Sequence, residues 1–318
     1  MIEHNGKTLE TNFGELGCPC RFIKGVSSPL GDTYYFDLIS ISNYNKAYLK
    51  SLIEKIAVFH HKDLSFVETK ESHFAVFMKH NQTKLSLSQI ISNHALNIGV
   101  DINGNKVAID FNKAPHLLIA GTTGSGKSVL IHNLLTNIMY SYKKPFQFVL
   151  IDPKGTELPM YRNVKNTTFV SETQKAINVL AQLENIMDNR YRNGTYHHEI
   201  FIVIDELADL MLTSRFEVEQ SIVRIAQKGR ACGLHLIVAT QSPRATVISG
   251  LIKANMPYRL ILKTTSVRES VVALDHKGSE ELQGCGDCIV KLGLDEKRTQ
   301  IAYCDNELES RLIQSYGG

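Results

Sequence analysis

The sequence has no long apolar run of the kind that crosses a lipid bilayer. A transmembrane helix needs about 18 or more consecutive apolar residues, and no stretch of this chain approaches that length. The first residues, MIEHNGK, also lack the basic start and apolar run of a secretory signal. We therefore expect a soluble, cytoplasmic protein with no membrane span of its own, which a partner must bring to any membrane where it works.

A strong net charge is also missing. The formal charge is +3 over 318 residues, so the net charge alone does not indicate a nucleic-acid partner. The distribution is less even, because residues 215–263 contain eight lysines or arginines but only two acidic residues. A locally basic stretch can contact phosphate groups, and it can equally be an ordinary solvated surface.

Cysteine is too sparse for a disulfide framework. The chain has six cysteines, and proteins of the cytoplasm rarely keep disulfides. Cys285 and Cys288 have the C-x-x-C spacing of a redox pair or of half a zinc site, to which Cys18 and Cys20 could add two ligands. The favoured interpretation is that residues 284–287 form a tight turn, and metal or redox chemistry is the alternative.

The apolar pattern divides the chain into two parts, with no internal repeats or low-complexity tracts. Residues 1–92 predict a small α+β subdomain without a catalytic cluster. Its helix is expected at 44–59, where apolar residues recur at helical spacing. Strands are expected at 34–39, 64–68 and 73–78.

Residues 93–318 alternate short apolar runs with amphipathic segments. Near-continuous apolar runs are typical of parallel strands buried on both faces, and they are found at 116–120, 146–151, 200–204, 235–239 and 259–262. Helices are expected at 129–139, at 171–192 and around 218–225. The second of these begins with a capping-box pattern, Ser171 to Gln174. The alternation predicts an α/β doubly wound fold with a mainly parallel sheet.

The segment GTTGSGKS at 121–128 matches the phosphate-binding pattern G-x4-G-K-S/T. Its glycines allow backbone N–H groups to converge on phosphate, and the N-terminus of the following helix favours anions. Lys127 is expected to reach the β- and γ-phosphates and Ser128 to ligate Mg²⁺. The alternative, a glycine-rich structural turn, does not explain why a strand precedes this segment and a helix follows it. We predict that ATP binds at Gly121, Thr122, Thr123, Gly124, Ser125, Gly126, Lys127, Ser128 and Val129.

An acidic pair follows the predicted strand at 200–204. Asp205 is expected to hold Mg²⁺, and Glu206 to polarise the attacking water, which favours hydrolysis over transfer to a substrate hydroxyl. Gln241 ends another strand, and polar residues at such a tip face the ligand crevice in this kind of fold. Gln241 is therefore expected to sense the γ-phosphate or to orient water, and an ordinary loop amide is the alternative.

Together these motifs resemble the motor domain of the FtsK/SpoIIIE DNA translocases, in the HerA/FtsK group of P-loop ATPases. The resemblance runs from about residue 98 to residue 290, and the N-terminal part is similar to the family's small α subdomain. The matching segments are PHLLIAGTTGSGKS at 115–128, LIDPK at 150–154 with Glu157, Leu158 and Tyr161, VIDELADLM at 203–211, IAQKGR at 225–230, GLHLIVATQ at 233–241, VISGLIKANMP at 247–257 with Arg259, and GCGD at 284–287.

The resemblance implies a RecA-like P-loop NTPase that assembles as a ring, usually a hexamer, and pumps double-stranded DNA by hydrolysing ATP. Arg230 occupies the position of the arginine that a neighbouring subunit contributes to the nucleotide, where a guanidinium offsets charge that develops in the transition state. Lys253 falls on a position associated with DNA contact in the pore. Arg244 and Arg268 are further candidates for DNA contact.

The chain departs from the family pattern mainly at the expected DNA contacts. Ser242 stands where the family commonly has arginine, and Arg244 follows two residues later. In the pore segment 265–271, two basic positions are apolar, Val271 among them, and Arg268 is displaced by one residue. No membrane helices precede the domain and no winged-helix domain follows Gly318, so we do not expect directional reading of a chromosome.

Two functions fit these features. The first is a ring-forming translocase of double-stranded DNA in the transfer or segregation of plasmids or other mobile elements. The alternative is a DNA-binding coupling or adaptor ATPase that delivers a nucleoprotein complex, such as a relaxase–DNA complex, to a conjugation channel through a membrane partner. A small-molecule P-loop kinase is disfavoured by Glu206 and by the later motifs.

Overall fold

The structure is a computed structural model that describes residues 1–28, 31–40, 44–69, 72–80 and 84–317. Its contacts divide the chain into two compact units. The first comprises Met1–Leu85 and Val100–Asn105, and the second comprises Ser86–Gly99 and Lys106–Gly318. The expected domain boundary after residue 92 stays a prediction.

The first unit is a four-stranded antiparallel sheet with two helices. The strand order is β1-β2-β4-β3. Its core is aromatic, because the rings of Phe13, Phe36 and Phe74 pack at centroid distances of 5.3 to 5.6 Å. The predicted helix and strands are confirmed, and the structure adds a helix and a strand before them. The elements are α1 (Ile2–Glu15), β1 (Cys20–Ser28), β2 (Gly31–Leu38), α2 (Lys46–His60), β3 (Leu64–Val67) and β4 (Phe74–Lys79).

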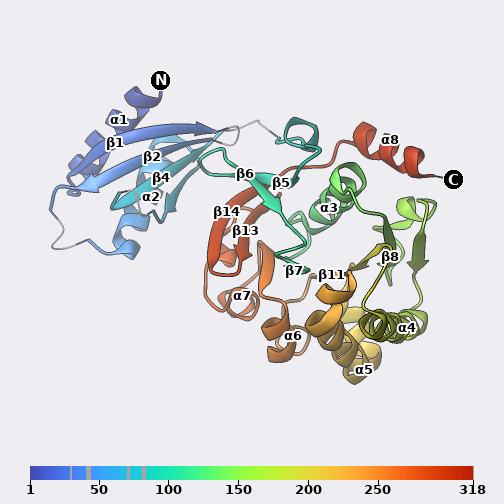
Figure 1. Ribbon diagram of the computed structural model, residues 1–318. Coiled ribbons are helices and arrows are strands. Elements are labelled where there is room, and N and C mark those ends of the chain that lie inside the picture. The colour runs from blue at the N-terminus through green and yellow to red at the C-terminus, as the bar shows by residue number, and fades with distance from the viewer. Residues whose placement is uncertain (29–30, 41–43, 70–71, 81–83, 318) are drawn as a thin grey trace. The chain divides into compact units, whose positions relative to one another are not determined.

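The second unit is built on a sheet in the order β6-β5-β14-β13-β12-β7-β11-β10-β8-β9 (Figure 1). The six strands from β12 to β9 run parallel, whereas β13 is antiparallel to both its neighbours. The mainly parallel α/β fold is therefore confirmed. The strands are β5 (Leu96–Asp101), β6 (Lys106–Ile109), β7 (His116–Ala120), β8 (Phe146–Ile151), β9 (Thr167–Val170), β10 (Glu199–Ile204), β11 (Leu234–Thr240), β12 (Tyr258–Leu262), β13 (Asp287–Leu292) and β14 (Asp295–Ile301).

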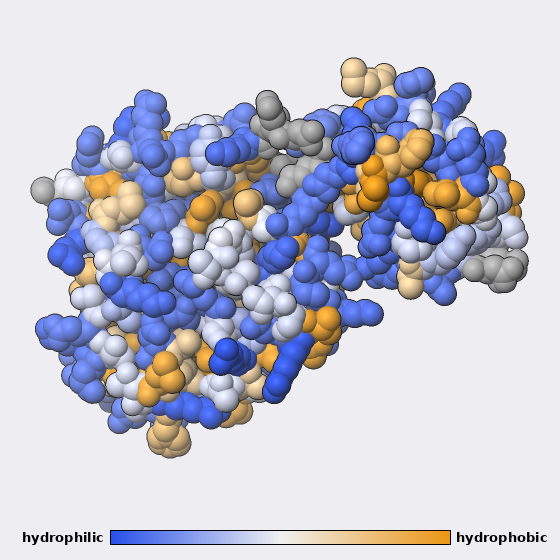
Figure 2. All heavy atoms as spheres, turned by 180° about the vertical axis from the view of Figure 1, so that it is seen from behind, coloured by the Kyte–Doolittle hydropathy of each residue, from blue (hydrophilic) through white to orange (hydrophobic). Residues whose placement is uncertain are grey.

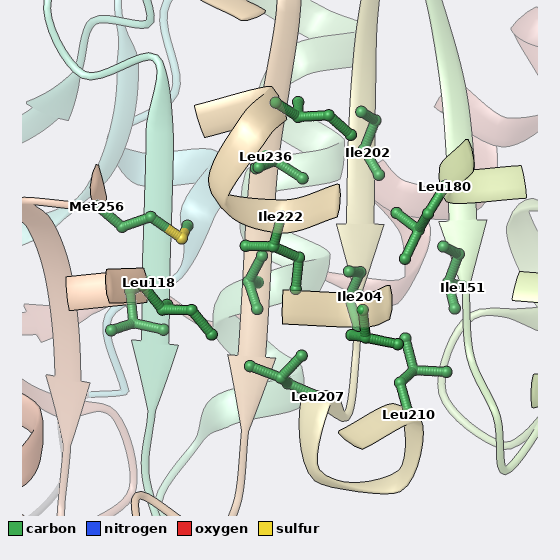
Figure 3. Close-up of a cluster of buried hydrophobic side chains, with 14 of the residues drawn as sticks. Leu118, Ile151, Leu180, Ile202, Ile204, Leu207, Leu210, Ile222, Leu236 and Met256 are labelled. Atoms are coloured by element: carbon green, nitrogen blue, oxygen red, sulfur yellow. The ribbon is translucent and has the colours of Figure 1, made fainter. Parts of the chain in front are cut away.

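Helices cover both faces of this sheet. Along β10, Ile202 and Ile204 point into a core shared with α4 and α5, whereas Phe201 and Val203 point into a core shared with α3. Figure 3 shows the first of these clusters, where Leu180 and Ile222 of the helices meet Ile202 and its neighbours on the strands. The helices are α3 (Lys127–Ser141), α4 (Thr173–Asn193), α5 (Leu207–Lys228), α6 (Gly250–Asn255), α7 (Val267–Leu274) and α8 (Asn306–Tyr316).

Two helix starts differ from the predictions. Helix α4 begins at Thr173 after Glu172 and has no side-chain cap, so the capping box predicted from Ser171 is wrong. Its end is as expected, because Gly194 adopts the left-handed conformation with φ 69°. Helix α5 begins at Leu207, directly after the acidic pair, and is longer than predicted. Its backbone is non-helical at Ser214, so α5 is kinked there.

In the described part of the chain, no helix combines the length and the hydropathy that a bilayer-spanning segment requires.

A buried ion-pair network lies at the amino ends of the central strands. Glu199, at the start of β10, accepts hydrogen bonds from His235 Nε2 at 2.8 Å, from Lys144 Nζ at 2.6 Å and from the Tyr142 hydroxyl. Burial by itself would raise the pKa of Glu199, but these hydrogen bonds outweigh it and lower the pKa to about 2. The network therefore stabilises the folded chain only while Glu199 is ionised.

Replacing this glutamate tests that stabilisation. A shift of the pKa from 4.5 to about 2 corresponds to about 3 kcal/mol of unfolding free energy, present above pH 4.5 and lost as the pH falls toward 2. We expect Glu199→Gln to lower the unfolding free energy by about that amount at pH 7, and by progressively less below pH 4.5. Urea titrations across this pH range measure it. Glu172→Gln is the control, because Glu172 is mostly exposed beside Lys175, and an equal loss in both variants would refute the assignment.

Candidate active site

The phosphate-binding loop connects β7 to α3 at the carboxyl edge of the parallel strands. Gly124 and Gly126 adopt positive φ angles of 76° and 105°, which most L-residues avoid. At Gly121, an added Cβ would lie 2.6 Å from Ser125 Oγ and 2.7 Å from Leu262 Cβ. Only glycine fits here, and the loop ends where α3 presents its unpaired first N–H groups.

Three other segments brace this loop. The backbone N–H of Gly121 donates to Thr240 O at the end of β11, and that of Thr122 donates to Lys263 O after β12. The Gly286 N–H donates to Ser125 O at 2.8 Å. The loop is thus held by the segments that follow its two neighbouring strands and by the turn at 284–287.

The turn at 284–287 is as predicted. Asp287 N donates to Gly284 O at 3.0 Å, and Gly286 has φ 90°. Cys285 is exposed, whereas Cys288 is buried in β13. Among the described residues there is no cluster of three or more metal-ligating side chains, so the zinc alternative gains no support.

Lys127 and Asp205 form a buried ion pair. Lys127 Nζ lies 2.5 Å from Asp205 Oδ1 and donates to Asp205 O at 2.8 Å. The two side chains are 3% and 1% exposed. Burial raises the pKa of the Asp205 carboxyl group, and the Lys127 ammonium opposes that rise. The structure brings together two residues that lie 78 positions apart in the sequence and that were both expected at the nucleotide site.

Glu206 lies beside this pair, and its carboxylate accepts hydrogen bonds from three donors of its own chain. It caps α5 by accepting the Ala208 N–H at 3.3 Å, and it accepts the Thr240 hydroxyl at 2.7 Å and the Gln241 N–H at 3.0 Å. The Gln241 side chain points the other way and accepts the Thr123 hydroxyl at 2.8 Å. Gln241 therefore connects the loop to Glu206.

Two residues of the site were not assigned roles from the sequence. Thr240 is fully buried and binds Glu206. Asp152 follows β8 as Asp205 follows β10, and its carboxylate accepts the N–H groups of Gly155, Glu157 and Leu158. An acid directly after a buried strand was the signal that could have identified Asp152.

The residues present fit a magnesium-bound triphosphate. Within the described chain the buried Ser125 Oγ has no hydrogen-bond partner, so the loop retains an unsatisfied polar atom. Ser128 and Asp205 supply oxygen ligands, and Lys127 supplies a cation. Magnesium usually takes one or two protein oxygens and completes its shell with water and phosphate.

Arg230 does not reach the loop of its own chain. It is exposed in the 3-10 turn Gly229–Cys232, immediately before β11. The loop lies at the other end of that strand, and the seven residues of β11 span about 20 Å, which exceeds the reach of one side chain.

The basic stretch is partly neutralised by acids from outside it. Lys253 Nζ pairs with Asp275 Oδ1 at 2.8 Å, and Arg259 pairs with the other oxygen at 2.6 Å. Arg224 pairs with Glu184 and Asp188. Of the three expected DNA contacts, Lys253 is thus engaged within the chain, whereas Arg244 and Arg268 are exposed.

The parallel sheet, the glycine-constrained loop and the acid pair define a P-loop ATPase of the RecA-like class. The sequence model of the FtsK/SpoIIIE family matches residues 89–194 and 193–245. The chain carries an FtsK/SpoIIIE-family motor domain.

Curated relatives agree with this assignment. DNA translocase FtsK of Campylobacter jejuni is 42% identical over 215 residues, which cover 60% of this chain and 23% of the relative. DNA translocase FtsK of Leptospira interrogans is 38% identical over 246 residues, covering 68% and 26%. DNA translocase SftA of Bacillus subtilis is 41% identical over 216 residues, covering 60% and 23%. The chain spans about a quarter of the length of these relatives.

Solved structures show the same fold. The pCW3 conjugation coupling protein TcpA, in its monomer form with ATPgS, superposes with a TM-score of 0.69 at 21% identity, covering 96% of this chain and 98% of that chain. The cytoplasmic domain of the type VII secretion ATPase EccC of Thermomonospora curvata gives a TM-score of 0.61 at 22% identity, covering 74% and 33%.

The constraint at Gly126 can be tested by substitution. A Cβ there would lie 2.8 Å from Gly286 N, at φ 105°, so we expect Gly126→Ala to weaken ATP binding about ten-fold or more through strain of 1–3 kcal/mol. Titration with a fluorescent ATP analogue measures the affinity. Gly250→Ala is the control, because an added Cβ there meets no atom within 4 Å. Unchanged affinity in Gly126→Ala would contradict the tight packing of the loop.

Proposed function

We propose that the chain is an ATP-driven translocase of double-stranded DNA that works as a ring in the cytoplasm, in the transfer or segregation of plasmid or other mobile-element DNA. The observation that carries the proposal is the buried Lys127–Asp205 pair with Glu206 beside it. The 42% identity to a DNA translocase supports the choice of duplex DNA as substrate.

Each residue has a role that follows from its position. Lys127 would exchange Asp205 for the β- and γ-phosphates of ATP, and Asp205 and Ser128 would then hold Mg²⁺. Bound magnesium would neutralise phosphate charge. Glu206 would take a proton from the water that attacks the γ-phosphate, giving ADP and inorganic phosphate. Gln241 would report on the occupancy of the loop, since it already contacts Thr123.

The distance between Arg230 and the loop supports a ring. If Arg230 acts on a nucleotide, that nucleotide belongs to a neighbouring subunit, because β11 separates Arg230 from its own site. The surface offers apolar contacts for a neighbour, with Leu212 86% and Phe216 69% exposed on α5. Figure 2 shows such apolar patches scattered over a mainly hydrophilic face. A ring of six subunits would be usual for this family.

One observation favours the coupling protein as a second candidate. The structure of TcpA, a conjugation coupling protein, matches this chain over nearly the whole length of both. In that role the chain would deliver a nucleoprotein complex, such as relaxase-bound DNA, to a membrane partner. Contacts with proteins would then matter more than continuous movement, and long duplex DNA would not accelerate ATP turnover.

ATP turnover with and without duplex DNA separates these candidates. We expect long duplex DNA to raise the rate several-fold, Lys127→Ala to abolish turnover, and Glu206→Gln to keep ATP binding but lower turnover by a factor of about 100 or more. Phosphate release and analogue titration measure the two properties. A rate that is indifferent to long duplex DNA would contradict translocation and favour the coupling role.

Mixing two inactive variants tests whether Arg230 acts on a neighbour. Lys127→Ala subunits keep the arginine, and Arg230→Ala subunits keep the loop, so mixed particles should recover part of the wild-type turnover. Light scattering on the same samples should give a mass several times that of one chain. Arg192→Ala is the control, since Arg192 is exposed at the end of α4 and should remain active alone. No recovery in particles shown to contain both variants would contradict a shared site.

A further inference from the structure

The carboxylate of Glu206 is held mainly through one of its two oxygens. It is 3% exposed, and it accepts hydrogen bonds from Ala208 N, Thr240 Oγ1 and Gln241 N, the last of them through both of its oxygens. A carboxylate offers about four acceptor sites. Oε1 accepts all three donors, whereas Oε2 accepts the Gln241 N–H alone, so these bonds restrain the carboxylate through Oε1.

Thr240 makes the shortest of these bonds, and its hydroxyl is oriented for that purpose. The Ser242 N–H donates to Thr240 Oγ1 at 3.1 Å. A hydroxyl has a single proton to donate, and because Oγ1 accepts from Ser242, that proton is directed to Glu206 Oε1 at 2.7 Å. The other partners of Glu206 are backbone N–H groups, so Thr240 is the side chain that holds it.

The same end of β11 is bonded to the phosphate-binding loop. Thr240 O accepts the Gly121 N–H at 3.3 Å, and Gln241 Oε1 accepts the Thr123 hydroxyl at 2.8 Å. When the loop closes on a phosphate, its hydroxyl and N–H groups gain a charged partner that competes with these bonds. A change in the loop is thus transmitted through two neighbouring residues to Glu206.

We propose that Thr240 is a positioning residue whose hydrogen bond restrains Glu206 until the loop binds a triphosphate. The proposal rests on the role of Glu206 in ATP hydrolysis put forward above. Its consequence is that the resting site is protected from idle hydrolysis, because the base is bonded elsewhere until the loop is occupied.

Turnover kinetics separate restraint from a merely structural role. Thr240→Val keeps the volume and removes the hydroxyl, and we expect it to raise DNA-free kcat at least about three-fold with the KM for ATP unchanged. Stimulation by duplex DNA should shrink accordingly. Thr240→Ser keeps the hydroxyl and should behave as wild type. An unchanged or lower kcat in Thr240→Val would overturn restraint.

A double-mutant cycle tests the bond without relying on turnover. The unfolding midpoints of wild type, Thr240→Val, Glu206→Ala and the double variant should be non-additive in the absence of nucleotide. With magnesium and a non-hydrolysable ATP analogue they should become additive, because Glu206 has left Thr240. Non-additivity that persists with the analogue, or additivity without it, would overturn the proposal.

The two experiments distinguish a failure of this proposal from a failure of the proposed function. A wild-type chain that binds the analogue but never hydrolyses ATP would refute the translocase. The cycle would still decide whether Thr240 releases Glu206 on nucleotide binding.

Discussion

The buried ion pair between Lys127 and Asp205 is the interaction on which the site depends. Both side chains are almost completely buried, so each would be strongly destabilising without the other. The pair joins the first turn of α3 to the end of β10, and it fixes the loop against the sheet. A triphosphate with magnesium would supply a new partner to each charge at once, so binding exchanges one neutral arrangement for another rather than burying a new charge.

The loop is connected to segments beyond the acid pair. Its bonds to Thr240, Lys263 and Gly286 link it to the ends of β11 and β12 and to the turn before β13. Beyond these strands, Asp275 at the end of α7 pairs with Lys253 of α6 and with Arg259 of β12. Helices α6 and α7 carry two of the expected DNA contacts, Lys253 and Arg268. The loop is therefore connected to Glu206 and, through β12, to the helices that carry expected DNA contacts.

Sequence was sufficient wherever the signal was local. The apolar strands, the loop at 121–128 and the acids after β10 follow from periodicity and from steric limits on the backbone. The sequence was insufficient where the residues in contact lie far apart along the chain. Helix α1 was missed because its buried side chains are few, chiefly Leu9 and Phe13. The Lys253–Asp275 pair and the bond from Thr240 to Glu206 join residues 22 and 34 positions apart, and no local pattern marks them.

We propose that hydrolysis at this site moves the chain along duplex DNA. Displacement of a third strand bound to the duplex measures such movement directly. We expect wild-type protein with ATP and magnesium to displace the third strand, and we expect Glu206→Gln, which should bind ATP without hydrolysing it, to leave the third strand in place. ATP turnover that is stimulated by duplex DNA but leaves the third strand in place would contradict translocation.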